Sequence, residues 1–340
     1  IDNATYVGSG KANELSLMGS ELEADLFIFD DELSAIQLRT LEETLGARVI
    51  DRTTLILDIF ASRATSREGK LQVELAQMRY RLPRLIGQGQ VLSRLGGGIG
   101  TRGPGEKKLE IDRRRIRRRV FELETELSEI EKQRGLRRES RKANRIPLVA
   151  LVGYTNAGKS TMLNALTDSN VLAEDKLFAT LDPVVRKITL SGGTEALLSD
   201  TVGFINKLPH DLVEAFKSTL EEVSNSDLIL QVVDISCPYH EKQMRVVDGV
   251  LESLHAADIP RIIVFNKADA VPSRDLPAES ENRLNVSALC GTGIEKLLSA
   301  VELKLNSART EVDILVPYSK YEAVSMIRDR GMLLSEEHTE

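Results

Sequence analysis

The feature that most constrains this fold is a glycine-containing segment that follows a short apolar run and leads into a helical pattern. Residues 146–152 have the length and composition of a buried strand, and residues 153–160 follow with the sequence Gly-Tyr-Thr-Asn-Ala-Gly-Lys-Ser. Further apolar runs lie at 184–190, 196–198, 228–233 and 262–265, and they alternate with helical patterns at 159–166, 212–223, 242–254 and 294–305. This alternation predicts an α/β domain with a mostly parallel sheet and helices on both faces.

The segment 153–160 matches the phosphate-loop (P-loop) pattern G-x-x-x-x-G-K-S in the strand-loop-helix context that the pattern requires. Its glycines let backbone N–H groups surround phosphate oxygens, and the positive end of the following helix dipole favours negative charge. We expect Lys159 to reach the β and γ phosphates and the Ser160 hydroxyl to bind Mg²⁺. The predicted phosphate-binding residues are Gly153, Tyr154, Thr155, Asn156, Ala157, Gly158, Lys159, Ser160 and Thr161.

A D-x-x-G pattern ends the run at 196–198. The carboxylate of Asp200 can hold the metal through water, and the N–H of Gly203 can approach the γ phosphate. Thr180 can complete the Mg²⁺ shell only while the γ phosphate is present, as in a switch segment; an ordinary loop threonine is the alternative. The predicted residues are Asp200, Thr201, Val202, Gly203, Phe178, Ala179, Thr180, Leu181 and Asp182, with Lys159, Thr180 and Gly203 as the catalytic set and Ser160, Thr180 and Asp200 as metal ligands.

The choice of base is predicted by Asn266, Lys267, Ala268 and Asp269, which follow the run at 262–265. The Asp269 carboxylate can accept hydrogen bonds from N1–H and the exocyclic amino group of guanine. Adenine would present an acceptor and leave a buried charge unpaired. Ser287, Ala288 and Leu289 are expected to offer backbone contacts to guanine O6. Four patterns in this order predict an enzyme that binds GTP and GDP and hydrolyses GTP.

The residue after D-x-x-G is Phe204, where many GTPases carry the glutamine that orients the attacking water. A phenyl ring cannot orient water, so intrinsic hydrolysis should be slow, and completing such a site can accelerate it by about 10⁵-fold. We hypothesise that a partner or a monovalent cation supplies part of this. Asn156 is placed to ligate K⁺ beside the β and γ phosphates; an asparagine that only stabilises the loop is the alternative.

Upstream of residue 146 the sequence predicts two further units, and one follows residue 306. Residues 24–50 predict strand, helix and strand within an α/β subdomain at 1–70. Apolar stripes at 71–85 and 116–130, separated by the glycine-rich stretch 96–105, predict an antiparallel helical hairpin over 71–145. Pro83 is expected to kink or end the first helix. The GTPase domain then spans 146–306, and 307–340 begin a truncated α/β unit.

Positive charge is concentrated in the hairpin. The net charge is −7, and residues 102–145 hold 16 Lys and Arg against 9 Asp and Glu, a balance of +7 that leaves −14 elsewhere. This asymmetry favours RNA binding with strong salt dependence; a solvated face balanced by Glu106, Glu110 and Asp112 is the alternative. The predicted RNA-contacting residues are Arg102, Lys107, Lys108, Arg113, Arg114, Arg115, Arg117, Arg118 and Arg119.

The sequence predicts a cytoplasmic protein. The two cysteines, Cys237 and Cys290, lack metal-ligand spacing and fit a reducing compartment. The apolar runs are far shorter than the about 20 residues that span a bilayer. A sequence that opens at Ile1 without a basic, apolar leader predicts no signal peptide and a start within a longer protein. We expect a monomer when the protein is free.

Several segments together resemble the HflX family of ribosome-associated GTPases. They are VIDRTTLILDIFASRA, GGGIGTRGPGE followed by the arginine-rich helix, GYTNAGKST, FATLDP and DTVGFI. The resemblance covers nearly the whole chain and implies binding to the large ribosomal subunit, release of stalled ribosomes by subunit splitting under stress, and stimulation by the ribosome. It also implies a hydrophobic residue at the glutamine position, which matches Phe204. The alternatives are a GTP-dependent partner in ribosome assembly or RNA modification, and a nucleotide-gated adaptor without significant turnover.

Overall fold

The structure is a computed structural model. It describes residues 2–3, 5–95, 104–143, 146–167, 184–191, 193–206, 217–307, 313–317, 322, 324 and 335–337. The segment containing Thr180, the hairpin tip with Arg102 and most of the predicted C-terminal unit lie outside these residues.

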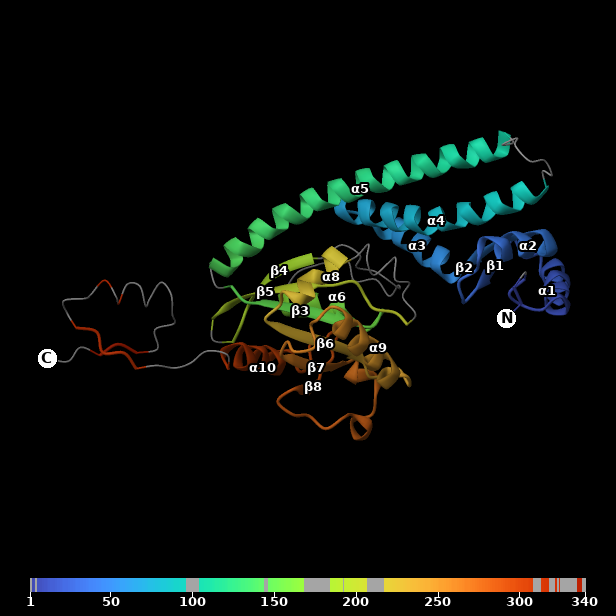
Figure 1. Ribbon diagram of the computed structural model, residues 1–340. Helices are drawn as coiled ribbons and strands as arrows, with labels where there is room; N and C mark the ends of the chain where they lie inside the picture. The colour runs from blue at the N-terminus through green and yellow to red at the C-terminus, as the bar shows by residue number, and fades with distance from the viewer. Residues whose placement is uncertain are drawn as a thin grey trace.

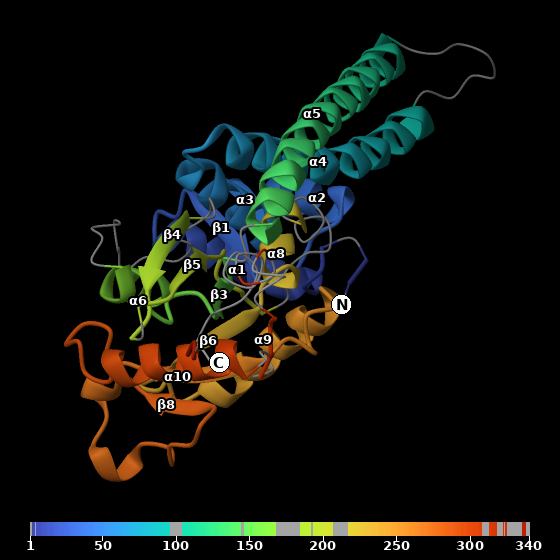
Figure 2. The ribbon, with the colours of Figure 1, turned by 90° about the vertical axis from the view of Figure 1, so that its left-hand side faces the viewer.

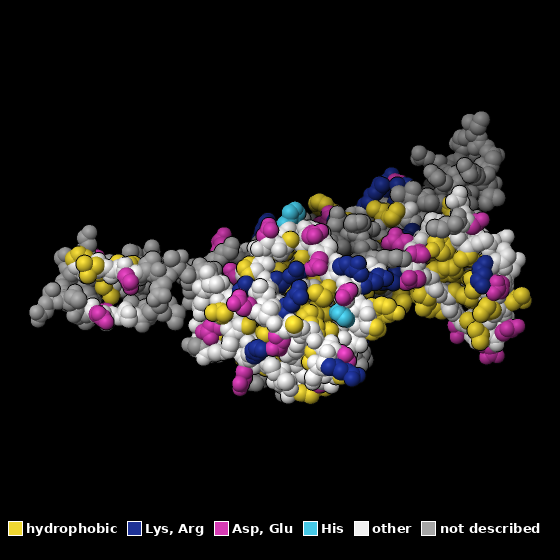
Figure 3. Space-filling model, turned by 90° about the horizontal axis from the view of Figure 1, so that it is seen from below, with side chains coloured by type: hydrophobic (Ala, Val, Ile, Leu, Met, Phe, Trp, Pro, Cys, Tyr) yellow, Lys and Arg dark blue, Asp and Glu magenta, His cyan; other side chains and the backbone are white. Residues whose placement is uncertain are grey.

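The N-terminal α/β unit has the predicted order of strand, helix and strand. Its strands β1 (Leu26–Phe29) and β2 (Arg48–Asp51) pair in parallel. Between them runs α2 (Ala35–Leu45), which begins with a capping box of Ser34 and Gln37 and ends at Gly46 with φ 68°. Helices α1 (Ser9–Glu21) and α3 (Arg52–Arg63) have no counterpart among the predicted elements. Apolar side chains gather on the exposed surface of this unit (Figure 3), among them Leu17, Leu22, Leu26 and Ile28.

The predicted hairpin consists of α4 (Arg67–Leu95) and α5 (Pro104–Ala143), which lie side by side (Figures 1 and 2). They pack through Leu71 and Leu75 of α4 and Leu123 of α5. Pro83 does not end α4, which continues for three further turns. Past this point Arg84 donates to Leu33 O at 3.0 Å and to Asp51 Oδ2 at 2.9 Å. Packing on the N-terminal unit therefore holds the part of the helix that the proline weakens.

The GTPase domain has a six-stranded sheet in the order β4-β5-β3-β6-β7-β8, parallel except for the antiparallel β4–β5 pair. The mostly parallel sheet predicted from the sequence is thus confirmed. The strands are β3 (Leu148–Gly153), β4 (Val184–Thr189), β5 (Glu195–Asp200), β6 (Leu228–Asp234), β7 (Arg261–Asn266) and β8 (Arg283–Asn285). The helices are α6 (Lys159–Thr167), α8 (Lys217–Ser224), α9 (His240–Ser253) and α10 (Ile294–Asn306), with short 3-10 turns η1 (Ala268–Ala270) and η2 (Ser273–Asp275).

Helices cover both faces of this sheet. On one face Leu151 of β3 packs with Met162 of α6 and Leu297 of α10. On the other face Val152 of β3 packs with α8 and α9 and also with the upstream helices α3 and α4. Helix α3 of the N-terminal unit and the hairpin base therefore share one hydrophobic core with the GTPase domain, whereas α2 and β2 pack in a separate core. Within the described residues, no helix is long and apolar enough to span a bilayer.

Candidate nucleotide site

The loop between β3 and α6 has the backbone that the sequence pattern predicts. Asn156 and Gly158 adopt positive φ angles of 63° and 90°. A Cβ at Gly158 would lie 2.3 Å from Asn266 Nδ2, and a Cβ at Gly153 would lie 2.3 Å from the Val232 carbonyl oxygen. Gly153 is therefore required by the close approach of the β6 backbone, and Gly158 by its positive φ and the nearby Asn266 amide. Asn156 is exposed, and asparagine tolerates this backbone conformation well.

Lys159 starts α6 and is buried beneath the loop. Its Nζ donates to the carbonyl oxygens of Tyr154 at 3.2 Å and Gly153 at 3.4 Å. Burial lowers the pKa of this ammonium, and the nearby Asp200 carboxylate opposes that shift. Negatively charged phosphate oxygens would therefore stabilise this buried ammonium strongly.

Ser160 and Asp200 are brought together by the parallel pairing of β3 with β5. The Ser160 hydroxyl donates to Asp200 Oδ2 at 2.9 Å, and Asp200 is fully buried. A hydroxyl and a carboxylate are oxygen donors of the kind that Mg²⁺ prefers, with water and phosphate oxygens completing the octahedron. The two residues therefore fit the predicted metal. The third predicted ligand, Thr180, lies with Phe178, Ala179, Leu181 and Asp182 outside the described residues.

The D-x-x-G segment lies directly against the phosphate loop. Phe204 N donates to Gly153 O at 3.0 Å, and Thr155 N donates to Phe204 O at 2.9 Å. A Cβ on Gly203 would lie 2.9 Å from the backbone Cα of Thr155 in the phosphate loop, so only glycine allows this approach. The ring of Phe204 is 1% exposed and lies in the core shared with α3 and α4. The residue at the glutamine position is thus a core residue that points away from water.

The base-specificity segments are joined to the phosphate loop by Asn266. Its Nδ2 donates to Ala157 O at 2.9 Å, and its Oδ1 accepts from Ala288 N at 3.0 Å. Lys267, at φ 62°, donates to Asp234 Oδ2 at 2.7 Å. Asp269 is exposed on η1, and Leu289 and Cys290 are exposed in the loop that follows β8. The sequence patterns omitted Asp234, although its place at the end of β6 marks the same edge of the sheet.

The hairpin arginines fall into two groups. Arg119 makes a two-point ion pair with Glu74 of α4 at 2.7 and 2.8 Å. That hydrogen bond lowers the pKa of Glu74. Arg113 is half-buried near Glu110. The exposed group consists of Arg114, Arg115, Arg117 and Arg118. Of these, Arg114, Arg115 and Arg118 also lie near carboxylates of α5 itself at 3.1 to 3.9 Å. The side chains of Lys107 and Lys108 lie outside the described residues.

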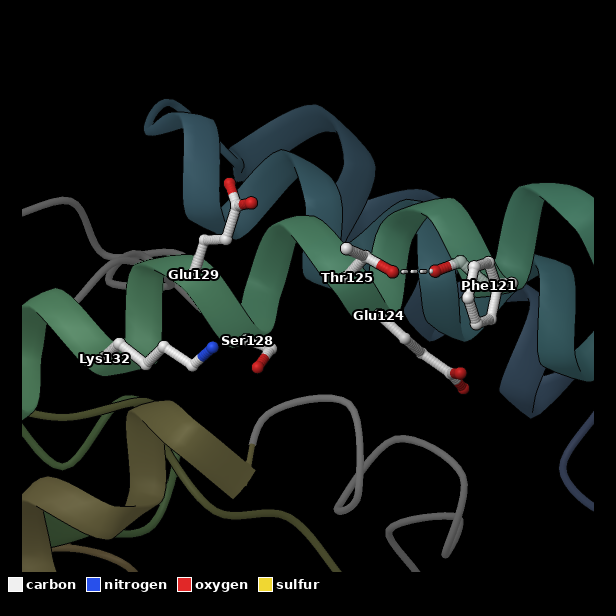
Figure 4. Close-up of a pocket in the computed structure, with 6 residues that line it drawn as sticks. All are labelled: Phe121, Glu124, Thr125, Ser128, Glu129 and Lys132. Carbon is white, nitrogen blue, oxygen red and sulfur yellow. Dashed lines mark hydrogen bonds between the residues drawn. The ribbon is translucent and has the colours of Figure 1, made fainter.

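A shallow hollow lies on α5 beyond the arginines, lined by Phe121, Glu124, Thr125, Ser128, Glu129 and Lys132 (Figure 4). The Thr125 hydroxyl donates to Phe121 O at 2.8 Å, and the Phe121 ring is 69% exposed. Its lining carries two carboxylates and one ammonium, which suits phosphate poorly. This hollow is therefore a poorer candidate for a nucleotide than the loop edge of the sheet.

The fold and the loop edge together define a P-loop GTPase. Residues 148–267 match the family model described as "50S ribosome-binding GTPase". Residues 1–61 match "GTP-binding GTPase N-terminal", 63–141 match "GTP-binding GTPase Middle Region", and 275–340 match "HflX C-terminal domain".

The chain belongs to the HflX family of GTPases. It is 53% identical over 340 residues to GTPase HflX of Caldanaerobacter subterraneus subsp. tengcongensis, which covers 100% of this chain and 79% of that protein. It is 46% identical over 317 residues to GTPase HflX of Escherichia coli, covering 92% of this chain and 74% of that protein. Among solved structures, the crystal structure of the SsGBP and GDP complex matches with a TM-score of 0.50 and 25% identity, covering 90% of this chain and 88% of that one.

Proposed function

We propose that this GTPase binds the large ribosomal subunit through its hairpin and couples GTP binding and hydrolysis to subunit splitting or rescue under stress in the cytoplasm. The observation that carries the proposal is the core shared between the segment after D-x-x-G and the hairpin base. Phe204 and Ile205, directly after D-x-x-G, pack in one cluster with Phe60 of α3 and Tyr80 of α4. A displacement of this segment by the γ phosphate must therefore disturb the packing of α4.

The exposed arginines of α5 support a ribosomal partner because RNA presents a regular lattice of phosphates. Arg114, Arg115 and Arg118 have side chains that are 76%, 78% and 83% exposed. Their intrahelical ion pairs are weak in water and can exchange a carboxylate for a phosphate. We propose that these residues and Arg117 contact ribosomal RNA, whereas Arg119 holds the hairpin together through Glu74.

We further propose that residues 153–161 bind the phosphates of GTP, that Asp269 and residues 287–289 select guanine, and that Ser160, Thr180 and Asp200 hold Mg²⁺. The ion, when bound, neutralises charge on the β and γ phosphates. Lys159 then orients the same oxygens, and the N–H of Gly203 approaches the γ phosphate from the adjoining segment. Because Phe204 is buried, the group that orients water comes from the partner, or from K⁺ held beside Asn156.

The test is GTP hydrolysis by the full chain with and without large ribosomal subunits, across a range of salt concentrations and in K⁺ or Na⁺. We expect slow turnover alone and strong stimulation by the subunit that fades as salt rises. Absence of stimulation would refute the ribosomal partner. Equal rates in K⁺ and Na⁺, with and without subunits, would refute the cation at Asn156 and leave the partner as the source.

A further inference from the structure

The backbone of Asn206, three residues after the glycine of D-x-x-G, is held from two sides. Its N–H donates to the hydroxyl oxygen of Tyr154, inside the phosphate loop, at 3.1 Å. Its carbonyl oxygen accepts from Nη2 of Arg52, in the N-terminal unit, at 2.9 Å. Asn206 thus connects the phosphate loop to Arg52, which lies 154 positions before Asn206 in the sequence.

Arg52 is a well-anchored donor. It is the first residue of α3, and the preceding Asp51 caps that helix by accepting from Thr54 N at 2.9 Å. Asp51 is fully buried and also accepts from Leu33 N, the Tyr80 hydroxyl and Arg84. The other end of the Arg52 guanidinium donates to Asp30 Oδ1 at 2.6 Å. Asp30, which directly follows β1, therefore holds one end of the guanidinium, and the capped start of α3 holds the backbone of Arg52.

The hydrogen bond from Arg52 to Asn206 lies next to an apolar contact between the same two segments. Phe204 and Ile205, next to Asn206, are 1% and 7% exposed and pack against Ile56, Leu57 and Phe60 of α3. The backbone of Phe204 pairs with the phosphate loop on both sides of Tyr154. Packing alone lets a segment slide, whereas a charged donor on one carbonyl fixes its register.

We propose that Arg52 is a positioning residue of the GTPase. Through Asn206 it holds the D-x-x-G segment against Tyr154 of the phosphate loop, so that the N–H of Gly203 is placed for the γ phosphate. GDP has no γ phosphate and does not use this contact. Arg52 therefore sets the preference of the free enzyme for GTP over GDP, and this inference rests on the proposed binding of GTP at residues 153–161.

The test is the affinity of the full chain for a non-hydrolysable GTP analogue and for GDP, with Mg²⁺ and without ribosomes. Arg52→Ala should weaken binding of the analogue by about tenfold, the effect of one hydrogen bond to a charged donor. Binding of GDP should change by less than about twofold. Arg52→Lys, which keeps the charge but loses the planar fork, should lie between Arg52→Ala and the wild type. Arg48→Ala, an exposed arginine of β2 in the same unit, should match the wild type.

A double-mutant cycle separates this role from general support of the fold. Tyr154→Phe removes the other contact to the same backbone, so the effects of Arg52→Ala and Tyr154→Phe should be less than multiplicative in the double variant. Equal loss of both nucleotides, an unchanged ratio, or fully multiplicative effects would each overturn the proposal. If Arg52→Ala fails to fold by circular dichroism, Arg52→Lys and Tyr154→Phe decide the question alone.

Lys159→Ala tests the underlying assignment separately. It should lose both nucleotides. Retention of both would refute the proposed phosphate site. If Lys159→Ala binds neither nucleotide and the GTP-to-GDP ratio of Arg52→Ala is unaltered, only the role of Arg52 is refuted.

Discussion

The phosphate loop and the exposed arginines of α5 both present positive charge suited to phosphate, and they do so by opposite means. Lys159 is buried, held by two backbone carbonyls, and surrounded by glycines that admit no side chain. Arg118 is 83% exposed and paired with a carboxylate one turn away. The loop can therefore bind one phosphate chain in one geometry, whereas the helix can meet many phosphates in many geometries at a strength set by salt.

The largest effect should follow removal of the buried cation. Lys159→Ala is expected to weaken GTP binding by more than about a hundredfold, because charge-assisted bonds to phosphate are lost in a buried place. Titration with a fluorescent GTP analogue measures it. Lys187→Ala, an exposed lysine of β4 paired with Glu195, is the matched control and should bind normally. Normal GTP binding by Lys159→Ala would contradict the difference between the buried phosphate loop and the exposed arginines of α5.

Phe204→Gln tests whether the glutamine position is catalytic or structural in this chain. The ring is 1% exposed, so the change should lower the free energy of unfolding by about 3 kcal/mol. The rate of GTP hydrolysis should not rise, because the amide of the new glutamine points into the core. Denaturant unfolding and single-turnover hydrolysis measure the two effects. Phe121→Gln, at a 69% exposed site, should change stability by less than about 0.5 kcal/mol. Faster hydrolysis by Phe204→Gln would contradict the burial argument.

Charge reversal on α5 should affect the ribosome and spare the nucleotide. Replacing Arg114, Arg117 and Arg118 with Glu is expected to weaken subunit binding at low salt by about a hundredfold or more. The slope of log affinity against log salt should fall by roughly 2 to 3, since each lost phosphate contact removes somewhat less than one unit. Replacement of Arg39 and Arg48, two exposed arginines of the N-terminal unit, with Glu is the control. An unchanged slope would show that α5 does not contact RNA.

The smallest effect concerns the pair that holds the hairpin. Arg119 lowers the pKa of Glu74, so the pair stabilises the fold above the unfolded-state pKa and stops doing so as pH falls through the lower folded-state value. Glu74→Gln should lower the free energy of unfolding by at most about 1 kcal/mol at neutral pH, because both side chains of the pair are more than a third exposed. Melting curves from pH about 7 to 3 should show less acid dependence than in the wild type. Glu43→Gln, in an exposed pair of α2, is the control.

Local patterns predicted the elements well wherever a segment carries its own signal. The strands and the helices α6, α9 and α10 follow from short apolar runs and helical spacing, and the phosphate loop from its glycines. Helix α3 was missed, although Asp51 before Thr54 and the apolar residues Ile56, Leu57 and Phe60 carry a cap and a stripe. The continuation of α4 past Pro83 could not be predicted, because contacts to Asp51 and Leu33 in another unit stabilise it.

The sequence by itself determined the P-loop fold, because strand, glycine loop and helix lie next to one another in the chain and the shape of the loop depends on its own glycines. It also determined the family. Only the tertiary structure decided that Phe204 is buried, that Arg119 pairs within the hairpin while Arg114, Arg115, Arg117 and Arg118 remain exposed, and that Arg52 contacts Asn206. Each of these depends on a contact between residues far apart in the sequence, and a pattern confined to one segment contains no information about its partner.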